Sequence, residues 1–328
     1  MATRLKNIEN SGFSANSAME GNRLINQDGT ANLRKTGLPL FTRLSIYHTL
    51  LKLPRWKFLL LIFGWYTLLN LAFAGVYYGI GVDHLAGTQQ HAGRGTQFME
   101  AFFFSSQTLT TVGYGHMAPM GLLVNVIASI ESFLGIIMFA LVTGVFYGRF
   151  SRPRAFLIFS RHMVIAPFKG GRALMIRLAS YKNNHLTDVD AQFTMAMHQE
   201  ENGKTVTRYY PVPLDIAKIN SLALSWTVVH RLDEESPFFN MSAAEITNTK
   251  FELIVNIKAF DDHFSNTVLQ RTSYLSSQLV YGAKFTQMYE RDPEGRYTIL
   301  AIDKIGDYEK VNIEALEPQN ATAVPTNA

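Results

Sequence analysis

A run of five residues, Thr111-Val112-Gly113-Tyr114-Gly115, implies a definite chemistry through its residue types and their order. Rings of backbone carbonyl oxygens replace the hydration shell of a cation, and this run is the sequence of potassium selectivity filters. Aligned carbonyls need alternating backbone angles, and Gly113 and Gly115 reach positive φ without a Cβ penalty. We therefore predict K⁺ at four backbone carbonyls, those of Thr111, Val112, Gly113 and Tyr114. The side chains of Val112 and Tyr114 are expected to pack backward, against the preceding helix.

A short apolar segment, residues 98–109, precedes this run. As a helix, its 12 residues would span about 18 Å, which is too short for a hydrocarbon core of about 30 Å. A re-entrant helix that reaches only partway into the membrane is therefore predicted. The irregular backbone that follows it at membrane depth is tolerated only where it lines a polar cavity or is buried in protein. A bare Gly-Tyr-Gly also occurs in ordinary turns, so the alternative is an extracellular turn. The short helix before the run favours the filter.

Two long apolar segments flank the short one. Residues 58–80 contain no charged residue and no histidine, and residues 117–148 contain one charged residue, Glu131. A transmembrane helix needs about 20 predominantly apolar residues, which predicts spans at 58–80 and 121–147. Basic residues gather before the first span and after the second: Arg43, Lys52, Arg55, Lys57, Arg149, Arg152, Arg154 and Arg161. The positive-inside rule then predicts an integral membrane protein of the plasma (inner) membrane with both termini cytoplasmic.

The second span carries a stripe of residues at four-residue spacing: Glu131, Gly135, Phe139, Thr143 and Tyr147. Such residues share one face of a helix, and we predict that this face forms the inner pore and gate. An acid inside a membrane span is costly and is therefore a functional candidate. Three alternatives stay open. Glu131 could bond to the back of the short helix and support the filter, Gly135 could bend the span or allow close packing, and the two aromatic residues could pack between helices.

Residues 42–55 are predicted to form a short amphipathic helix along the inner leaflet. Its apolar side would consist of Leu44, Tyr47, Leu50 and Leu51. Pro54 disfavours helical geometry at the residue before it, which separates this helix from the first span. The alternative is a plain cytoplasmic linker.

From Ala155 onward the hydrophobic pattern changes to period two, which is typical of strands. The strand candidates are residues 174–178, 191–198, 222–229, 251–260, 280–288 and 297–302. Many short strands separated by turn signals predict a β-sandwich over residues 151–310, after a pore domain over residues 56–150. Residues 1–41 and 311–328 lack periodicity and are expected to be flexible tails, although part of the first could add a strand.

Composition and motifs argue against other classes of protein. The 328 residues include no cysteine, which excludes disulfide scaffolds, thiol chemistry and cysteine-bound zinc. The net charge of +4 does not demand a nucleic-acid partner. The chain has no Gly-x-Gly-x-x-Gly after a strand, no Walker lysine and no Gly-x-Ser-x-Gly elbow. We expect no enzyme activity and no cofactor, with K⁺ only as the permeant ion.

The filter and the predicted sandwich together resemble the inward-rectifier potassium channel family, particularly its prokaryotic branch. Further stretches that look like family blocks are residues 175–179, 225–237, 251–255, 270–275 and 279–285. The resemblance covers roughly residues 42–305. It implies a membrane α plus β fold: a two-transmembrane-helix pore module with re-entrant pore helix and filter, and a cytoplasmic immunoglobulin-like β-sandwich that extends the pore. It also implies a homotetramer and an interfacial slide helix at residues 42–55.

The resemblance implies further site residues. Asp188 matches an acidic position of the cytoplasmic pore. Phe139 stands where animal members carry an acid that binds blocking polyamines and magnesium, which argues against strong voltage-dependent rectification. The family binds phosphoinositide near the inner leaflet, where basic residues attract anionic headgroups. The matching residues, predicted to bind anionic lipid, are Arg55, Lys57, Arg149, Arg152 and Arg154. The alternative is that these residues only set the topology.

Two functions remain as hypotheses. The first is a potassium-selective channel that conducts passively as a tetramer, is gated at the inner helix bundle and cytoplasmic domain, and is modulated by anionic lipid. The second is a membrane-anchored β-sandwich that serves as a receptor or scaffold without conduction. The short apolar segment and the filter favour the first, because a mere anchor needs neither.

Overall fold

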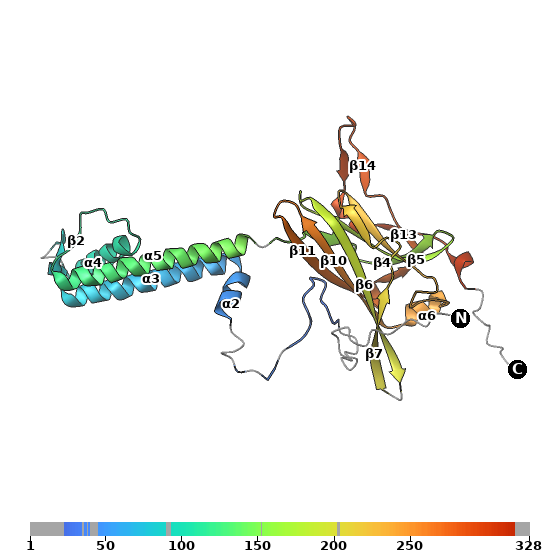
Figure 1. The fold of residues 1–328 in the computed structure, drawn as a ribbon, viewed down its shortest axis with the longest axis horizontal. Coiled ribbons are helices and arrows are strands. Elements are labelled where there is room, and N and C mark those ends of the chain that lie inside the picture. The colour runs from blue at the N-terminus through green and yellow to red at the C-terminus, as the bar shows by residue number, and fades with distance from the viewer. Residues whose placement is uncertain are drawn as a thin grey trace. The chain divides into compact units, whose positions relative to one another are not determined.

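The computed structural model describes most of the chain. The described residues are 23–34, 36–37, 39, 45–89, 93–151, 153–201 and 204–318. The chain divides into two compact units, one over residues 36–152 and one that combines residues 1–35 with 153–328. We call them the helical unit and the β unit, and Figure 1 shows the ribbon of each.

Within its described residues, the helical unit has four helices. They are α2 (Ile46–Lys52), α3 (Arg55–Ile80), α4 (Arg94–Leu109) and α5 (Leu122–Phe150). A 3-10 turn (Val82–His84) and the two-residue strands β1 (Leu85–Ala86) and β2 (Ala118–Pro119) connect them. Both α3 and α5 are long and apolar enough to cross a membrane. The two predicted spans are therefore present, and α3 begins directly after Pro54, three residues earlier than predicted.

Helix α4 packs against both long helices near one end of the pair, as Figure 1 shows. The buried apolar residues at this junction come from all three helices: Ala74, Tyr77, Ala101, Phe104, Val124 and Ala128. The Tyr77 and Phe104 rings meet edge-on with centroids 5.0 Å apart, which is a favoured geometry for aromatic pairs. With 16 residues, or about 24 Å, α4 is longer than predicted but still too short to cross a bilayer.

The β unit contains two five-stranded sheets. The first has the order β11-β10-β6-β7, with β8 paired to β6. Its strands are β6 (Leu186–Glu201), β7 (Lys204–Val212), β8 (Lys218–Ser221), β10 (Phe251–Asp261) and β11 (Asn266–Leu275). The second has the order β12-β4-β5-β3, with β9 paired to β5. Its strands are β3 (Leu157–Phe159), β4 (Met163–Phe168), β5 (Gly171–Ser180), β9 (Ser225–Arg231) and β12 (Leu279–Tyr281).

Smaller elements complete the β unit. The helix α6 covers Ala243–Asn248, and two short ladders pair β13 (Ala283–Phe285) with β16 (Tyr308–Lys310) and β14 (Tyr289–Arg291) with β15 (Thr298–Leu300). The 3-10 turns cover Ser276–Gln278, Ile302–Gly306 and Glu314–Leu316. The two large sheets with these additions make the β-rich, immunoglobulin-like domain that was predicted.

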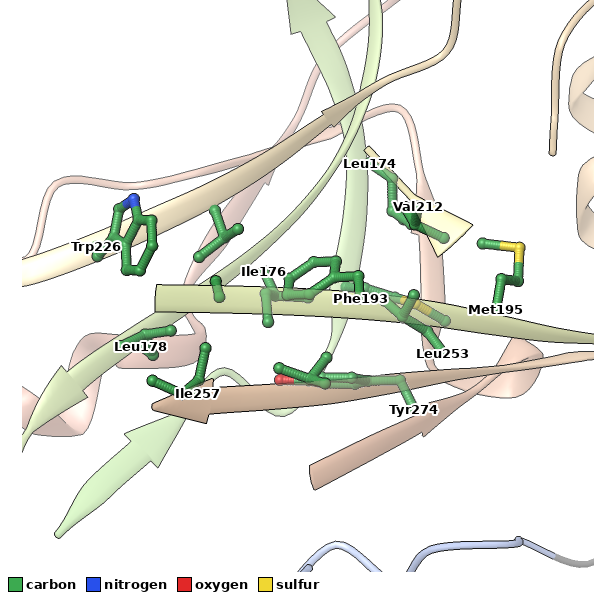
Figure 2. Close-up of a cluster of buried hydrophobic side chains, with 14 of the residues drawn as sticks. Leu174, Ile176, Leu178, Phe193, Met195, Val212, Trp226, Leu253, Ile257 and Tyr274 are labelled. Carbon is green, nitrogen blue, oxygen red and sulfur yellow. The ribbon is translucent and has the colours of Figure 1, made fainter. Parts of the chain in front are cut away.

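The main core of the β unit is formed by alternate residues from both large sheets, as Figure 2 shows. Leu174, Ile176 and Leu178 of β5 are buried in it, together with Phe193 and Met195 of β6. Because successive side chains of a strand point to opposite faces, residues two apart enter the same core. The period-two pattern of residues 191–198 and 251–260 therefore did predict which face is buried.

One predicted strand and one predicted tail differ from the structure. The candidate at residues 280–288 is split, because Gly282 has a φ of 65° and separates β12 from β13. A Cβ at Gly282 would lie 2.9 Å from the Val311 carbonyl oxygen, so the close approach of the chain also requires glycine. Residues 311–318, part of the predicted tail, include Ile313, which is buried in the main core. Residues 319–328 lie outside the described residues.

Part of the other predicted tail, residues 23–34, lies on the β unit and is called the N-terminal strap below. Its anchor is the buried carboxylate of Glu252 in β10, which accepts the backbone N–H groups of Leu24 at 2.7 Å and Ile25 at 3.1 Å. The Ser273 hydroxyl of β11 donates to the Ile25 carbonyl, and Arg23 donates to the Ser273 carbonyl. The strap is therefore fixed by the polar groups of two strands.

The buried His230 of β9 bonds through both ring nitrogens. Nδ1 lies 2.6 Å from the Pro213 carbonyl oxygen, and Nε2 lies 2.8 Å from the Ser236 hydroxyl. Since a carbonyl only accepts, Nδ1 carries the hydrogen, and in the neutral ring Nε2 accepts from Ser236. Burial lowers the pKa of His230, although the Pro213 carbonyl and the charge of Asp233 act in the opposite direction. The structure therefore favours the neutral ring.

We expect acid to destabilise the β unit through His230. Its folded pKa lies below the unfolded value of about 6.5, so its contribution is present above about pH 6.5 and is lost as the pH falls through the folded pKa. Apparent Tm in detergent, measured from pH 8 to pH 5 by the circular dichroism of the β-sheet, should fall less steeply in His230→Gln than in the wild type. Parallel pH profiles of the two proteins would contradict this role.

Candidate ion pathway

The predicted filter run follows directly on α4. The backbone φ is positive at every second residue, with 60° at Thr111, 48° at Gly113 and 80° at Gly115. The two glycines adopt this conformation freely, whereas a non-glycine residue in the left-handed region costs about 1–2 kcal/mol. A run of carbonyls directed to one side needs such alternation. Positive φ at Gly113 and Gly115 is as predicted, and ion coordination by this run stays a prediction.

The end of α4 holds the first residues of this run. Thr111 N–H donates to the Thr108 carbonyl at 3.1 Å. The N–H groups of Val112 and Gly113 both donate to the Gln107 carbonyl, at 3.0 and 3.3 Å. The last carbonyls of a helix lack partners within that helix, so these bonds satisfy α4 and offset the unfavourable conformation of Thr111.

Glu131 of α5 is fully buried between the three longer helices of the helical unit. The Tyr77 hydroxyl of α3 donates to its Oε2 at 2.7 Å, and the Ser105 hydroxyl of α4 donates to its Oε1 at 2.5 Å. Ser105 Oγ also lies 3.2 Å from Oδ1 of Asn70 in α3. The assignment of Glu131 to the inner pore is thus corrected. The carboxyl obtains its hydrogen bonds from the back of α4, which is the alternative that the sequence left open.

Gly135, one turn further along α5, also faces α4. A Cβ at this position would lie only 2.0 Å from the Leu109 carbonyl oxygen at the end of α4. The glycine therefore allows the two helix backbones to touch, and its assignment to the pore-lining stripe is likewise corrected. Of the two alternatives left open, close packing is the one that the contact requires.

The other half of the predicted stripe lies on the free surface of the single chain. Phe139 and Tyr147 are both 74% exposed, and Thr143 is exposed as well. Four-residue spacing drifts around an α-helix by about 40° per step, so one end of the stripe meets α4 while the other end does not. The role of these three residues in an inner pore and gate stays a prediction.

The basic residues differ in their surroundings. Arg149 of α5 donates through both terminal nitrogens to backbone carbonyls at the end of α2. Arg55 and Lys57 are exposed at the start of α3, and Arg154 is exposed in the β unit. Arg152 lies outside the described residues. Lipid binding by this group stays a prediction.

Asp188 lies at an irregularity of β6. Its φ is 47°, and the register with β10 shifts between Lys258 and Phe260 opposite it. Bulges of this kind redirect a side chain, and the Asp188 carboxylate lies 3.1 Å from Nζ of Lys218. Both side chains are largely exposed, so the pair contributes at most about 1 kcal/mol. The place of Asp188 in a cytoplasmic pore stays a prediction.

The polar cluster around Glu131 was not predicted from the sequence. Tyr77 and Ser105 bond to the carboxyl, and Asn70 bonds to Ser105. These residues come from two helices, and their meeting depends on how each helix is rotated about its axis. One signal was present, because Asn70 is the only side-chain amide in residues 58–80. Because a polar group inside a span needs a partner, Asn70 was a sign of a buried polar cluster.

Comparison with known proteins agrees with this arrangement. The family "Inward rectifier potassium channel C-terminal domain" matches residues 157–322, and the family "Ion channel" matches residues 65–152. The bacterial protein "Inward rectifier potassium channel Kirbac3.1" of Paramagnetospirillum magnetotacticum is 31% identical over 276 residues, which cover 84% of this chain and 92% of that protein.

Animal relatives are more distant. "G protein-activated inward rectifier potassium channel 2" of Homo sapiens is 26% identical over 293 residues, which cover 80% of this chain and 67% of that protein. "Inward rectifier potassium channel irk-1" of Caenorhabditis elegans is 24% identical over 305 residues, which cover 86% of this chain and 56% of that protein.

Both units of the structure match parts of potassium or other ion channels. The filter run and both spanning helices lie largely within the region matched to ion channels, and the β unit lies largely within the region matched to the C-terminal domain. Proteins of this class are membrane-integral ion channels rather than enzymes. As its sequence resemblance predicted, the chain belongs to the inward rectifier potassium channel family.

Proposed function

We propose that this chain conducts K⁺ selectively and passively across a membrane as a homotetramer. The alternating positive φ of Thr111, Gly113 and Gly115 is the observation that carries the proposal, because it is the backbone geometry that aligned carbonyls need. Membership of the family and the position of α4 between two spanning helices support it. K⁺ is the permeant ion, bound at the carbonyls of the filter run, and no cofactor is proposed.

The exposed apolar residues of the helical unit support assembly from several copies. Val112 is 53% exposed and Tyr114 is 79% exposed in the single chain, so the preceding helix α4 does not cover them as expected from the sequence. Carbonyl rings around an ion require equivalent residues from several chains. In the tetramer, the filter side chains pack between copies, and the exposed half of the α5 stripe surrounds the inner pore and forms its gate.

Both termini are proposed to be cytoplasmic, with the β unit extending the pore on that side of the plasma (inner) membrane. The exposed Arg55, Lys57 and Arg154 then attract anionic headgroups, each contributing about 1 kcal/mol near the surface. Anionic lipid thereby modulates the gate. Weak rectification follows from the apolar residue at position 139.

The competing function is a membrane-anchored receptor or scaffold without conduction. Uptake of a potassium tracer into liposomes that contain the purified full-length protein separates the two. The proposal expects uptake well above that of protein-free liposomes, and dependence on the anionic lipid content. Absence of uptake at every lipid composition would favour the scaffold.

Phe139→Asp should introduce block by internal polyamine. A ring of carboxylates in a narrow, poorly hydrated pore attracts a multivalent cation, whereas the exposed Phe139 offers no charge. With spermine on the cytoplasmic side, outward current through the variant should fall at least tenfold at positive voltage, while the wild type changes little. Identical current–voltage curves would show that residue 139 does not face the pore.

A further inference from the structure

The last turn of α4 is joined to α3 by a pair of hydroxyl groups. The hydroxyl oxygen of Tyr66 in α3 lies 2.6 Å from Oγ of Ser106, so one hydroxyl donates to the other. Ser106 is the fourth residue from the end of α4, and both side chains are partly buried. Because the membrane interior supplies no water to replace a lost partner, this bond favours one distance between the two helices.

A second polar contact between the same helices lies one turn further along α3. The Asn70 side chain donates through Nδ2 to the Tyr66 carbonyl at 2.8 Å, and its Oδ1 lies 3.2 Å from Oγ of Ser105. Successive residues of a helix are about 100° apart around its axis, so Ser105 and Ser106 leave α4 in different directions. The two contacts with α3 therefore fix the rotation of α4 about its axis as well as its distance from α3.

The carbonyl group of Ser106 contacts the residue that precedes the filter run. It accepts the Thr110 backbone N–H at 3.2 Å and the Thr110 hydroxyl at 2.7 Å. The next residue is Thr111, whose φ of 60° is unfavourable for a residue with a Cβ. Such a conformation persists only where the surrounding structure holds it. A single serine thus bonds to α3 through its side chain and to the base of the filter run through its carbonyl.

We propose that Tyr66 is a positioning residue that determines how strongly the filter prefers K⁺ over Na⁺. The inference rests on the proposed function, in which the Thr111 carbonyl is one of those that bind K⁺. Without the Tyr66 hydroxyl, the last turn of α4 is free to move away from α3, and Thr110 follows Ser106. Thr111 then relaxes from its positive φ, and its carbonyl turns away from the ion. Loss of this carbonyl ring changes both the size and the field of the site, which are the two proposed sources of selectivity.

Two measurements separate this role from a merely structural one. The bi-ionic potential of liposomes gives the ratio of K⁺ to Na⁺ permeability, and this ratio does not depend on how many working channels the liposomes contain. Apparent Tm in detergent reports the stability of the helix pair. If the hydroxyl pair only stabilised the packing of α3 on α4, its removal would lower Tm and total uptake and leave the permeability ratio unchanged.

Removal of either hydroxyl should lower the permeability ratio. We expect a fall of at least fivefold in Tyr66→Phe, which keeps the aromatic ring and loses only the hydroxyl. Ser106→Ala removes the other half of the same bond, so its ratio should fall to a similar extent. In the double variant the ratio should fall no further than in either single variant, because residues that act through one contact are not additive.

Thr67→Val is the matched control. This hydroxyl is the next one along α3, but it donates to the Phe63 carbonyl of its own helix at 2.8 Å. Its removal takes a similar polar group out of the same span and leaves the contact with α4 intact. The permeability ratio of Thr67→Val should therefore equal that of the wild type.

Three results would overturn the proposal. They are a wild-type ratio in Tyr66→Phe, an equal fall in Thr67→Val, or additive effects of the two substitutions at the hydroxyl pair. If Tyr66→Phe does not assemble, Ser106→Ala carries the same test, and a wild-type ratio there would contradict the proposal in the same way. A wild-type protein that does not distinguish K⁺ from Na⁺ would instead refute the proposed function.

Discussion

Replacing Glu131 with leucine is expected to reduce K⁺ uptake at least tenfold. Leucine fills much of the same space but accepts no hydrogen bond, so the Tyr77 hydroxyl loses its partner and the Ser105 hydroxyl keeps only its longer contact with Asn70. A buried donor left without a partner costs about 1–3 kcal/mol, and the membrane interior supplies no water in its place. Relief of this cost requires α4 to rotate or shift, and α4 carries the filter run at its end.

Three further variants define the cause of that loss. Glu131→Gln should be much milder, because the amide oxygen accepts from one hydroxyl and the amide nitrogen donates to the other. Tyr77→Phe removes one bond and should lower uptake, whereas Tyr78→Phe, at the adjacent residue whose ring meets Phe98 edge-on, should not. Wild-type uptake in Glu131→Leu, or equal effects of the two tyrosine substitutions, would show that the carboxyl does not support α4.

Gly135→Ala is expected to impair both uptake and selectivity for K⁺. The new Cβ would lie 2.0 Å from the Leu109 carbonyl oxygen, and this neighbour is backbone that cannot rotate away. Helix α5 must therefore move away from the end of α4, where the chain turns into the filter. We expect at least a tenfold loss of K⁺ uptake, measured together with the ratio of K⁺ to Na⁺ uptake.

Gly144→Ala is the matched control for this substitution. It lies in the same helix, and a Cβ there would meet no other atom within 4 Å. Alanine is favoured over glycine in a helix by about 1 kcal/mol, so uptake and selectivity should both be retained. If Gly135 served only as a bending point, Gly135→Ala would change gating and leave the selectivity ratio as in the wild type, which would contradict the packing role.

The features predicted correctly from sequence are those that a local pattern determines. The spans follow from uninterrupted apolar length, and positive φ at Gly113 and Gly115 follows from residue type. Strand β10 shows clear alternation and was predicted to within one residue. Strand β11 (Asn266–Leu275) was not named as a strand, because few of its residues are apolar. One flank of β11 is bonded to the N-terminal strap through Thr272 and Ser273, which is a long-range contact.

The candidate site was predicted only where one helix sufficed. Four-residue spacing placed Glu131 and Tyr147 on a common stripe, but it gave no information on which neighbour each end of α5 meets. In the structure, Glu131 at one end of the stripe contacts α4, whereas Tyr147 at the other end is exposed in the single chain. Arg149 shows the same limit, because a basic residue at a span end predicts topology, whereas its contact with Leu50 depends on the fold of α2.

The central claim is that the filter run selects K⁺ over Na⁺, and a bi-ionic measurement tests it most directly. Liposomes that contain the purified protein are loaded with K⁺ and diluted into an equal concentration of Na⁺, and the membrane potential is followed with a voltage-sensitive dye. A K⁺-selective pathway predicts a large potential that is negative inside and that persists. A potential near zero, as equal permeability to the two ions would give, would contradict the account.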